Sequence, residues 1–144
     1  ADQYTVGRVG LQRTPGLSRQ AVARRKRLQH IVGTVDELPA GSKRIVQVDG
    51  LEIGVFNVRG SYYALPNRCL HQGGPLCEGN VGGTVRATAE SGWQPEWVQE
   101  GEIVVCPWHG LEFNITTGRC LARRRGRLRQ FTVRVENGQV TLDV

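Results

Sequence analysis

Two short segments, each with a cysteine followed closely by a histidine, restrict what this chain can fold into. The first pairs Cys69 with His71, the second pairs Cys106 with His109, and residues 72–105 lie between them. Thiolates and imidazoles are the donors preferred by iron–sulfur clusters, zinc and copper. If these four side chains share one site, the fold must bring two distant loops together.

The order of the donors favours a two-iron unit over a single metal ion. A structural zinc finger usually takes two cysteines from one segment and two histidines from another. Here each segment supplies one of each, with the cysteine first both times. Two equivalent loops would then clasp two irons, with both cysteines on one iron and both histidines on the other. A zinc-binding interaction module is the alternative, and it differs in being colourless.

The chain has two further cysteines, Cys77 and Cys120, so two disulfides are a formal possibility. A chain of 144 residues can bury a core without disulfides, and cytosolic cysteines more often bind metals than pair. We therefore expect Cys77 and Cys120 to be buried structural thiols.

Alternating apolar residues with two-residue turn signals between them predict antiparallel β structure. The expected strands are residues 44–48, 51–55, 61–65, 131–136 and 140–144. The expected turns are Asp49-Gly50, Arg59-Gly60 and Asn137-Gly138. Residues 51–55 alternate as a half-buried strand should.

The segment between these β regions has a different composition. Residues 66–119 are rich in Gly, Pro, Cys, His and Trp and show little regular alternation, so we expect a loop-rich metal-binding subdomain there. Residues 1–29 read as a basic arm, in which residues 20–29 form a short helix or stay disordered until a partner binds. The folded domain is expected over residues 30–144.

The pattern Cys-x-His … Cys-Pro-Trp-His-Gly resembles the Rieske family. Gly73-Gly74-Pro75-Leu76 after the first pair, and Phe113 and Thr117-Gly118 after the second, extend the resemblance over about residues 30–144. It implies an all-β Rieske fold, an antiparallel β sandwich with a loop-rich cluster-binding subdomain inserted. It also implies one [2Fe–2S] cluster per chain, held by Cys69, His71, Cys106 and His109.

The resemblance also identifies residues that tune the cluster. They are Gly73, Gly74, Pro75, Pro107, Trp108, Gly110, Leu111 and Phe113. The two glycines let backbone N–H groups approach the sulfurs, although they also suit a simple turn. Pro107 stiffens its loop or merely ends a strand, and Trp108 shields the cluster or is ordinary packing.

Two departures from high-potential Rieske proteins bear on the reduction potential. Those proteins carry a disulfide at the positions of Gly74 and Trp108, and Ser and Tyr hydroxyls at the positions of Leu111 and Phe113. Histidine ligation places Rieske potentials between about −150 and +300 mV, and hydrogen bonds to the sulfurs raise them. Without these groups we expect a value near about −150 mV.

The expected function is one-electron transfer, with the chain as a ferredoxin component between a flavin reductase and a terminal oxygenase. A small subunit held permanently in a larger oxidoreductase is the alternative. An oxygenase of this family also needs a mononuclear iron bound by two histidines and a carboxylate. Only His30 remains for such a site, so the chain is not itself a catalytic enzyme.

Basic residues outnumber acidic ones by 19 to 13, and residues 24–27 and 123–129 hold much of the excess. Such patches steer acidic partners or are merely solvated. Nucleic acid is disfavoured because aromatic side chains are not interleaved with the arginines. The oligomeric state stays open.

The sequence has no apolar segment long enough to span a membrane. Residue 1 is Ala and Met is absent, so we expect a processed or trimmed start and, by default, a cytoplasmic location.

A longer gap between the ligand pairs than in Rieske ferredoxins suggests an insertion at residues 84–101, which contain Trp93, Pro95 and Trp97. It is a partner-binding flap or a segment that packs on its own domain, and we favour packing.

Overall fold

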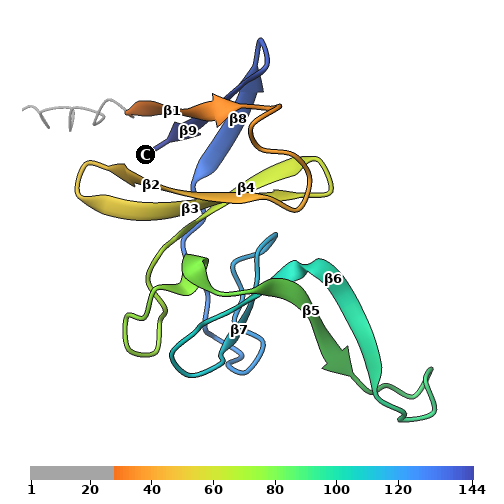
Figure 1. Cartoon of the computed structure of the whole chain (residues 1–144). Coiled ribbons are helices and arrows are strands. Elements are labelled where there is room, and N and C mark those ends of the chain that lie inside the picture. Colours follow the sequence, from red (N-terminus) through yellow and green to blue (C-terminus); the bar gives the residue numbers. More distant parts are fainter. Residues whose placement is uncertain (1–27) are drawn as a thin grey trace, which may run out of the picture.

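The computed structural model describes residues 28–144, which form three small antiparallel sheets (Figure 1). The first contains β1 (Gln29–Thr34), β9 (Gln139–Asp143) and β8 (Thr132–Glu136), in that order. The second contains β2 (Lys43–Val48), β3 (Leu51–Val58) and β4 (Ser61–Pro66). The third contains β5 (Val81–Arg86), β6 (Glu96–Val105) and β7 (Glu112–Asn114). A 3-10 turn, η1 (Leu76–Glu78), precedes β5.

The predicted all-β architecture is confirmed over this range. The predicted basic arm, residues 1–29, lies outside the described residues except at its end, where Gln29 begins β1. Within residues 28–144 no helix is long and apolar enough to cross a membrane.

The three predicted two-residue turns join the strands as expected. Asp49 and Gly50 have φ angles of 51° and 77°, and Asn137 and Gly138 have 50° and 75°. Two successive left-handed residues match the right-handed twist of the flanking strands. Asn, Asp and Gly adopt this conformation at low cost, so these two turns set the register of the β2–β3 and β8–β9 hairpins.

Strand β3 differs from its prediction as a half-buried strand. Only its first two residues are exposed, and from Ile53 to the end of the strand both faces are buried. Ile53 and Val55 face one core, whereas Phe56 and Val58 face another. The strand is central because it pairs with both β2 and β4 and lies between two layers of side chains.

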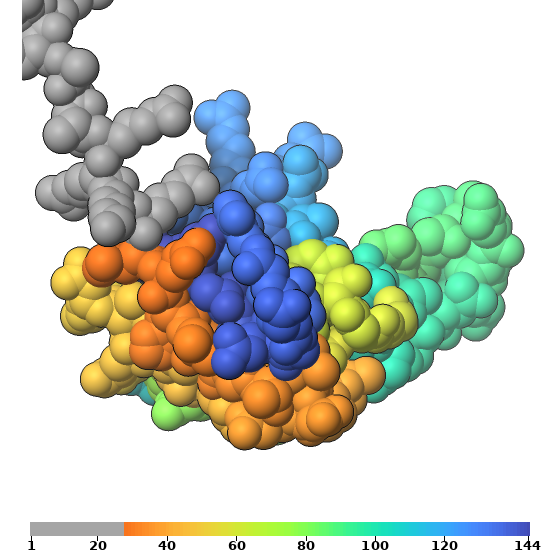
Figure 2. Space-filling view, turned by 90° about the horizontal axis from the view of Figure 1, so that it is seen from above, coloured from red at the N-terminus to blue at the C-terminus, as the bar shows by residue number. Residues whose placement is uncertain are grey.

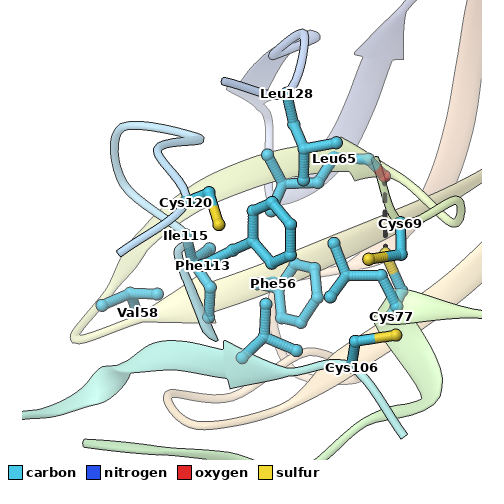
Figure 3. Close-up of a cluster of buried hydrophobic side chains, with 12 residues drawn as sticks. Phe56, Val58, Leu65, Cys69, Cys77, Cys106, Phe113, Ile115, Cys120 and Leu128 are labelled. Carbon is cyan, nitrogen blue, oxygen red and sulfur yellow. Dashed lines mark hydrogen bonds between the residues drawn. The ribbon is translucent and has the colours of Figure 1, made fainter. Parts of the chain in front are cut away.

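Two buried clusters of side chains hold the layers together. The first joins the first two sheets and contains Val32, Leu38, Val48, Ile53, Val55, Ala64, Phe131, Val140 and Leu142. The second lies on the opposite face of β3 and is drawn in Figure 3. It contains Phe56, Val58, Leu65, Cys69, Leu76, Cys77, Val104, Cys106, Phe113, Ile115, Cys120 and Leu128. Both predicted cysteine ligands, Cys69 and Cys106, therefore belong to the core that joins the inserted segment to the sandwich.

The inserted segment is more regular than its composition predicts. Strands β5 and β6 form a long antiparallel hairpin that extends away from the rest of the molecule (Figures 1 and 2). Trp93 is 71% exposed and Trp97 is 62% exposed. The expectation that residues 84–101 pack on their own domain is therefore wrong, because the hairpin is stabilised by its own strand pairing and carries its tryptophans on the surface.

Candidate metal centre

The first Cys/His segment is a tight loop between β4 and η1. The N–H of Gly73 donates to the carbonyl of Cys69 at 3.0 Å, and the N–H of Cys69 donates to the carbonyl of Gly74 at 2.8 Å. Gly73 has a φ of 74°, a conformation that favours glycine. These bonds close the loop around His71, whose side chain is exposed at its tip.

The second segment, between β6 and β7, has the same backbone pattern. The N–H of Gly110 donates to the carbonyl of Cys106 at 2.9 Å, and the N–H of Cys106 donates to the carbonyl of Leu111 at 2.8 Å. Gly110 has a φ of 71°, equivalent to that of Gly73. The two loops are structurally equivalent, as the order of their donors predicts.

The two predicted histidine ligands lie side by side at the surface. The Nδ1 atoms of His71 and His109 are 3.2 Å apart. The rings meet edge to face, with centroids 4.6 Å apart and planes at 88°. His71 and His109 are 38 residues apart in the sequence, and the two loops bring one ring nitrogen of each to the same point.

The two predicted cysteine ligands lie together beneath the histidines. Cys69 is 4% exposed and Cys106 is 1% exposed. Burial raises the pKa of the Cys69 thiol above its ordinary value, and the adjacent side chain of Cys106 raises it further through a hydrogen bond. A buried pair of thiols loses its protons readily only when a cation compensates the charge, so this pair suits iron.

The donors are grouped as two pairs and not around one point. Within residues 28–144, no three side chains among His, Cys, Asp and Glu converge closely enough to hold a single metal ion. A tetrahedral zinc site needs four donors at about 2.0–2.3 Å from one centre. A buried sulfur pair and an exposed nitrogen pair instead fit the two irons of a [2Fe–2S] unit with mixed ligands.

The predicted tuning residues surround these donors. A β-carbon placed on Gly74 would lie 2.9 Å from the Trp108 ring and 3.2 Å from the Cys106 sulfur, so the two loops are in contact there. Trp108 is 57% exposed and covers this contact from the solvent side. Pro75 precedes η1, and Pro107 is exposed in the second loop.

Leu111 and Phe113 lie on the inner side of the second loop. Phe113 is fully buried in the same core as Cys69 and Cys106, and Leu111 packs against that core while partly buried. Both side chains are hydrocarbon, so they offer no hydrogen-bond donor to a cluster sulfur at these positions.

Sequence reasoning missed one residue that positions the first loop. The buried side chain of Asn67 accepts a hydrogen bond from the N–H of Cys77 at 2.8 Å and donates to Glu52 at 3.1 Å. It therefore ties together the two ends of the loop that contains Cys69 and His71. No spacing in the sequence distinguishes this asparagine from an ordinary turn residue.

Fold and site together define a protein with an exposed histidine pair over a buried cysteine pair, carried on loops of a β sandwich. Residues 29–132 match the Rieske [2Fe-2S] domain. The chain belongs to this family. It carries one [2Fe–2S] cluster and acts as a one-electron carrier, not as a catalytic enzyme.

Named relatives and solved structures agree with this assignment. The chain is 28% identical over 109 residues to the ferredoxin component of naphthalene 1,2-dioxygenase/salicylate 5-hydroxylase systems of a Ralstonia species, covering 75% of this chain and 88% of that protein. It is similar to the ferredoxin of carbazole 1,9a-dioxygenase from Nocardioides aromaticivorans, with 27% identity, a TM-score of 0.60 and coverage of 79% and 95%. A second match, with 25% identity, a TM-score of 0.61 and coverage of 80% and 92%, comes from a complex of reduced oxygenase and oxidised ferredoxin in carbazole 1,9a-dioxygenase.

Proposed function

We propose that Cys69 and Cys106 bind one iron of the cluster and that His71 and His109 bind the other through Nδ1. The observation that carries this assignment is the 3.2 Å approach of the two Nδ1 atoms. Two unliganded imidazoles gain little from such a contact at the surface, whereas a metal between them gives both nitrogens a partner. The buried thiols behind them supply the second pair of donors.

The proposed cluster site has one side exposed to solvent and one side buried in the core. When bound, the cluster accepts and releases one electron, with one iron alternating between ferric and ferrous. His71 and His109 present their ring edges to solvent, so a partner can approach that side closely. On the other side Phe113 and Val104 are fully buried and exclude water from the sulfur ligands. Electrons therefore enter and leave through the histidine face.

The chain works in this proposal as a ferredoxin component. It takes electrons from a flavin reductase and delivers them to a terminal oxygenase, in the cytoplasm. The names of the relatives support this role, since they are ferredoxin components of dioxygenase systems. A permanent small subunit is the alternative, and it predicts purification in a fixed ratio with a larger oxidoreductase.

Electron paramagnetic resonance of the dithionite-reduced protein tests the ligand assignment. Two histidine ligands lower the average g value of a [2Fe–2S] cluster relative to four thiolates, and zinc gives no signal. We expect the mixed-ligand spectrum from the native protein and its loss in His71→Ala and in His109→Ala. Substitution of His30, the third histidine, by Ala is the matched control and should leave the spectrum unchanged, since His30 lies in β1 of the first sheet. A normal spectrum in His109→Ala contradicts the assignment.

A further inference from the structure

An arginine-rich loop, residues 119–129, pairs with β7, the strand that follows the second cluster-binding loop. It contains six arginines and no Asp or Glu. All six are exposed: Arg119, Arg123, Arg124, Arg125, Arg127 and Arg129. Like charges this close together repel one another, so the loop holds a concentrated positive potential.

Within the part of the chain that the structure describes, no acidic side chain forms an ion pair with an arginine of this loop. The ion pairs of residues 28–144 involve Arg44, Arg59 and Arg134, none of which belongs to the loop. Arg127 donates to the carbonyl of Thr117 at 3.2 Å, and Arg129 lies 4.7 Å from the centroid of the Phe131 ring. These contacts orient two guanidinium groups without neutralising them.

The base of the loop is fixed by its backbone. The N–H of Cys120 donates to the carbonyl of Gly126 at 2.8 Å, and Arg119 and Arg127 form an antiparallel bridge. A β-carbon on Gly126 would lie 3.0 Å from that of Cys120, so the two strands of the loop are closely packed. Residues 123–125 therefore project from a defined position.

The same contacts place the loop at the cluster end of the molecule. Cys120 pairs with Phe113, and the N–H of Leu121 donates to the carbonyl of Glu112 at 2.9 Å. Strand β7, which contains Glu112 and Phe113, begins three residues after His109. Figure 1 shows residues 121–126 at the same end as both Cys/His loops, away from β1 and β9.

We propose that residues 119–129 form a docking surface for an acidic face of the protein that exchanges electrons with the cluster. This inference rests on the proposed function, because it needs electrons to pass at the histidine face. Leu70 and Trp108 are exposed next to His71 and His109 in the cluster loops, and Leu121 is exposed in the arginine-rich loop itself. An apolar centre bordered by charge is the usual composition of a transient interface, in which the charges speed encounter.

An acidic protein fits this loop better than the other polyanions. Single-stranded nucleic acid is bound on aromatic stacking platforms, and residues 119–129 contain no aromatic residue. Anionic membranes are bound by basic segments with several large apolar side chains on one face, and Leu121 is the single exposed large apolar side chain of residues 119–129. A redox protein also makes use of the exposed imidazoles at the same end of the molecule in Figure 1.

Electron transfer to two proteins of opposite surface charge tests the proposal. The probes are plastocyanin, which has an acidic patch, and cytochrome c, which has a ring of lysines. One electron passes from the reduced protein to copper(II) or to ferric haem, leaving copper(I) or ferrous haem, and no bond or proton is transferred. Stopped-flow rate constants are measured for the native holoprotein, Arg124→Glu and Arg86→Glu from about 0.01 to about 0.3 M salt. Arg86 lies in β5 on the projecting hairpin, so its reversal gives the same change in net charge at a different place.

We expect Arg124→Glu to slow the reaction with plastocyanin at low salt by about three- to tenfold, and the difference to vanish at high salt. Arg86→Glu should have a clearly smaller effect, and with cytochrome c the charge reversal should accelerate the reaction. Equal effects of the two variants with plastocyanin, or no dependence on salt, overturn the proposal.

Two further measurements show whether the loop binds another polyanion and whether the cluster itself is present. If the native protein binds a labelled DNA duplex or phosphatidylserine vesicles at about 0.15 M salt, and Arg124→Glu abolishes that binding, the loop serves a different polyanion and the proposal fails. A native protein without the mixed-ligand resonance spectrum disproves the proposed function instead. A normal spectrum with unchanged kinetics in Arg124→Glu disproves only the docking surface.

Discussion

Gly74 in the first cluster loop faces the indole of Trp108 in the second so closely that a side chain does not fit between them. A β-carbon on Gly74 would lie 2.9 Å from two ring atoms of Trp108 and 3.2 Å from the sulfur of Cys106. High-potential Rieske proteins join the loops at these positions with a disulfide. Here packing of an aromatic ring on a glycine joins them instead.

Gly74→Ala should therefore disturb the metal centre. The added methyl group must displace the ring or the sulfur, and overpacking of this kind costs about 1–3 kcal/mol. We expect a lower midpoint in urea unfolding of the holoprotein and a broadened or shifted resonance spectrum. Gly74→Ala combined with Trp108→Ala is the control, because it removes the closer of the two contacts. If the double variant is as impaired as the single one, the ring is not the cause.

The reduction potential tests the chemistry of the second loop. With hydrocarbon side chains at Leu111 and Phe113, we expect a midpoint near about −150 mV, the low end for histidine-ligated clusters. Leu111→Thr should raise it, because a hydroxyl donor near cluster sulfur stabilises the reduced form. Leu111→Val is the matched control, since Val and Thr have nearly the same shape. Protein-film voltammetry measures all three proteins, and a native midpoint above about +100 mV contradicts the argument.

The hairpins and the proposed ligand set followed from local sequence signals. Asp49-Gly50 and Asn137-Gly138 specify their turns by themselves, because two successive left-handed residues admit few other sequences. The four donors were recognisable because metal chemistry requires particular atoms at particular spacings. Both kinds of signal act over a few residues.

The misjudged features depend on contacts between distant segments. β3 is buried on both faces because a second core, built from residues 69–128, covers it, and alternation within five residues cannot reveal that. The projecting hairpin is stabilised by the pairing of β5 with β6, and no pattern within residues 84–101 indicates that the segment extends away from the core. The role of Asn67 depends on Cys77, ten residues away, being brought back to it by the loop.

Gly54 offers a test of how the inserted segment joins the sandwich. A β-carbon on Gly54 would lie 2.5 Å from both the β-carbon and the sulfur of Cys77, so the side chain of Cys77 in η1 packs directly on the backbone of β3. Gly54→Ala should lower the free energy of unfolding by about 1–3 kcal/mol, measured in urea. Gly82→Ala is the control in a strand, because its nearest new contact is an ordinary 3.7 Å to Trp97. If the free energy of unfolding falls equally in the two variants, strand propensity and not the contact with Cys77 causes the destabilisation.

Cys77 should be unreactive in the native protein. It is fully buried, and burial raises the pKa of its thiol to about 12 from an ordinary value of 9.0. Alkylation requires the thiolate, so iodoacetamide at about pH 8 should leave Cys77 unmodified in the native protein and label it after unfolding. Peptide mass spectrometry after timed labelling gives the rate at each cysteine, and labelling of native Cys77 as fast as a small free thiol would refute its burial.

The same thiol makes stability depend on alkaline pH. Below about pH 9 the thiol is neutral in both folded and unfolded chains, and its pKa shift has no effect. Between about 9 and about 12 the unfolded chain loses the proton while the folded chain keeps it, so the free energy of unfolding falls as pH rises. Cys77→Ala removes the titrating group but also a buried sulfur, which lowers stability at every pH. We therefore expect a smaller decline in its unfolding free energy from pH 9 to pH 11 than in the native protein, and parallel declines would contradict the assignment.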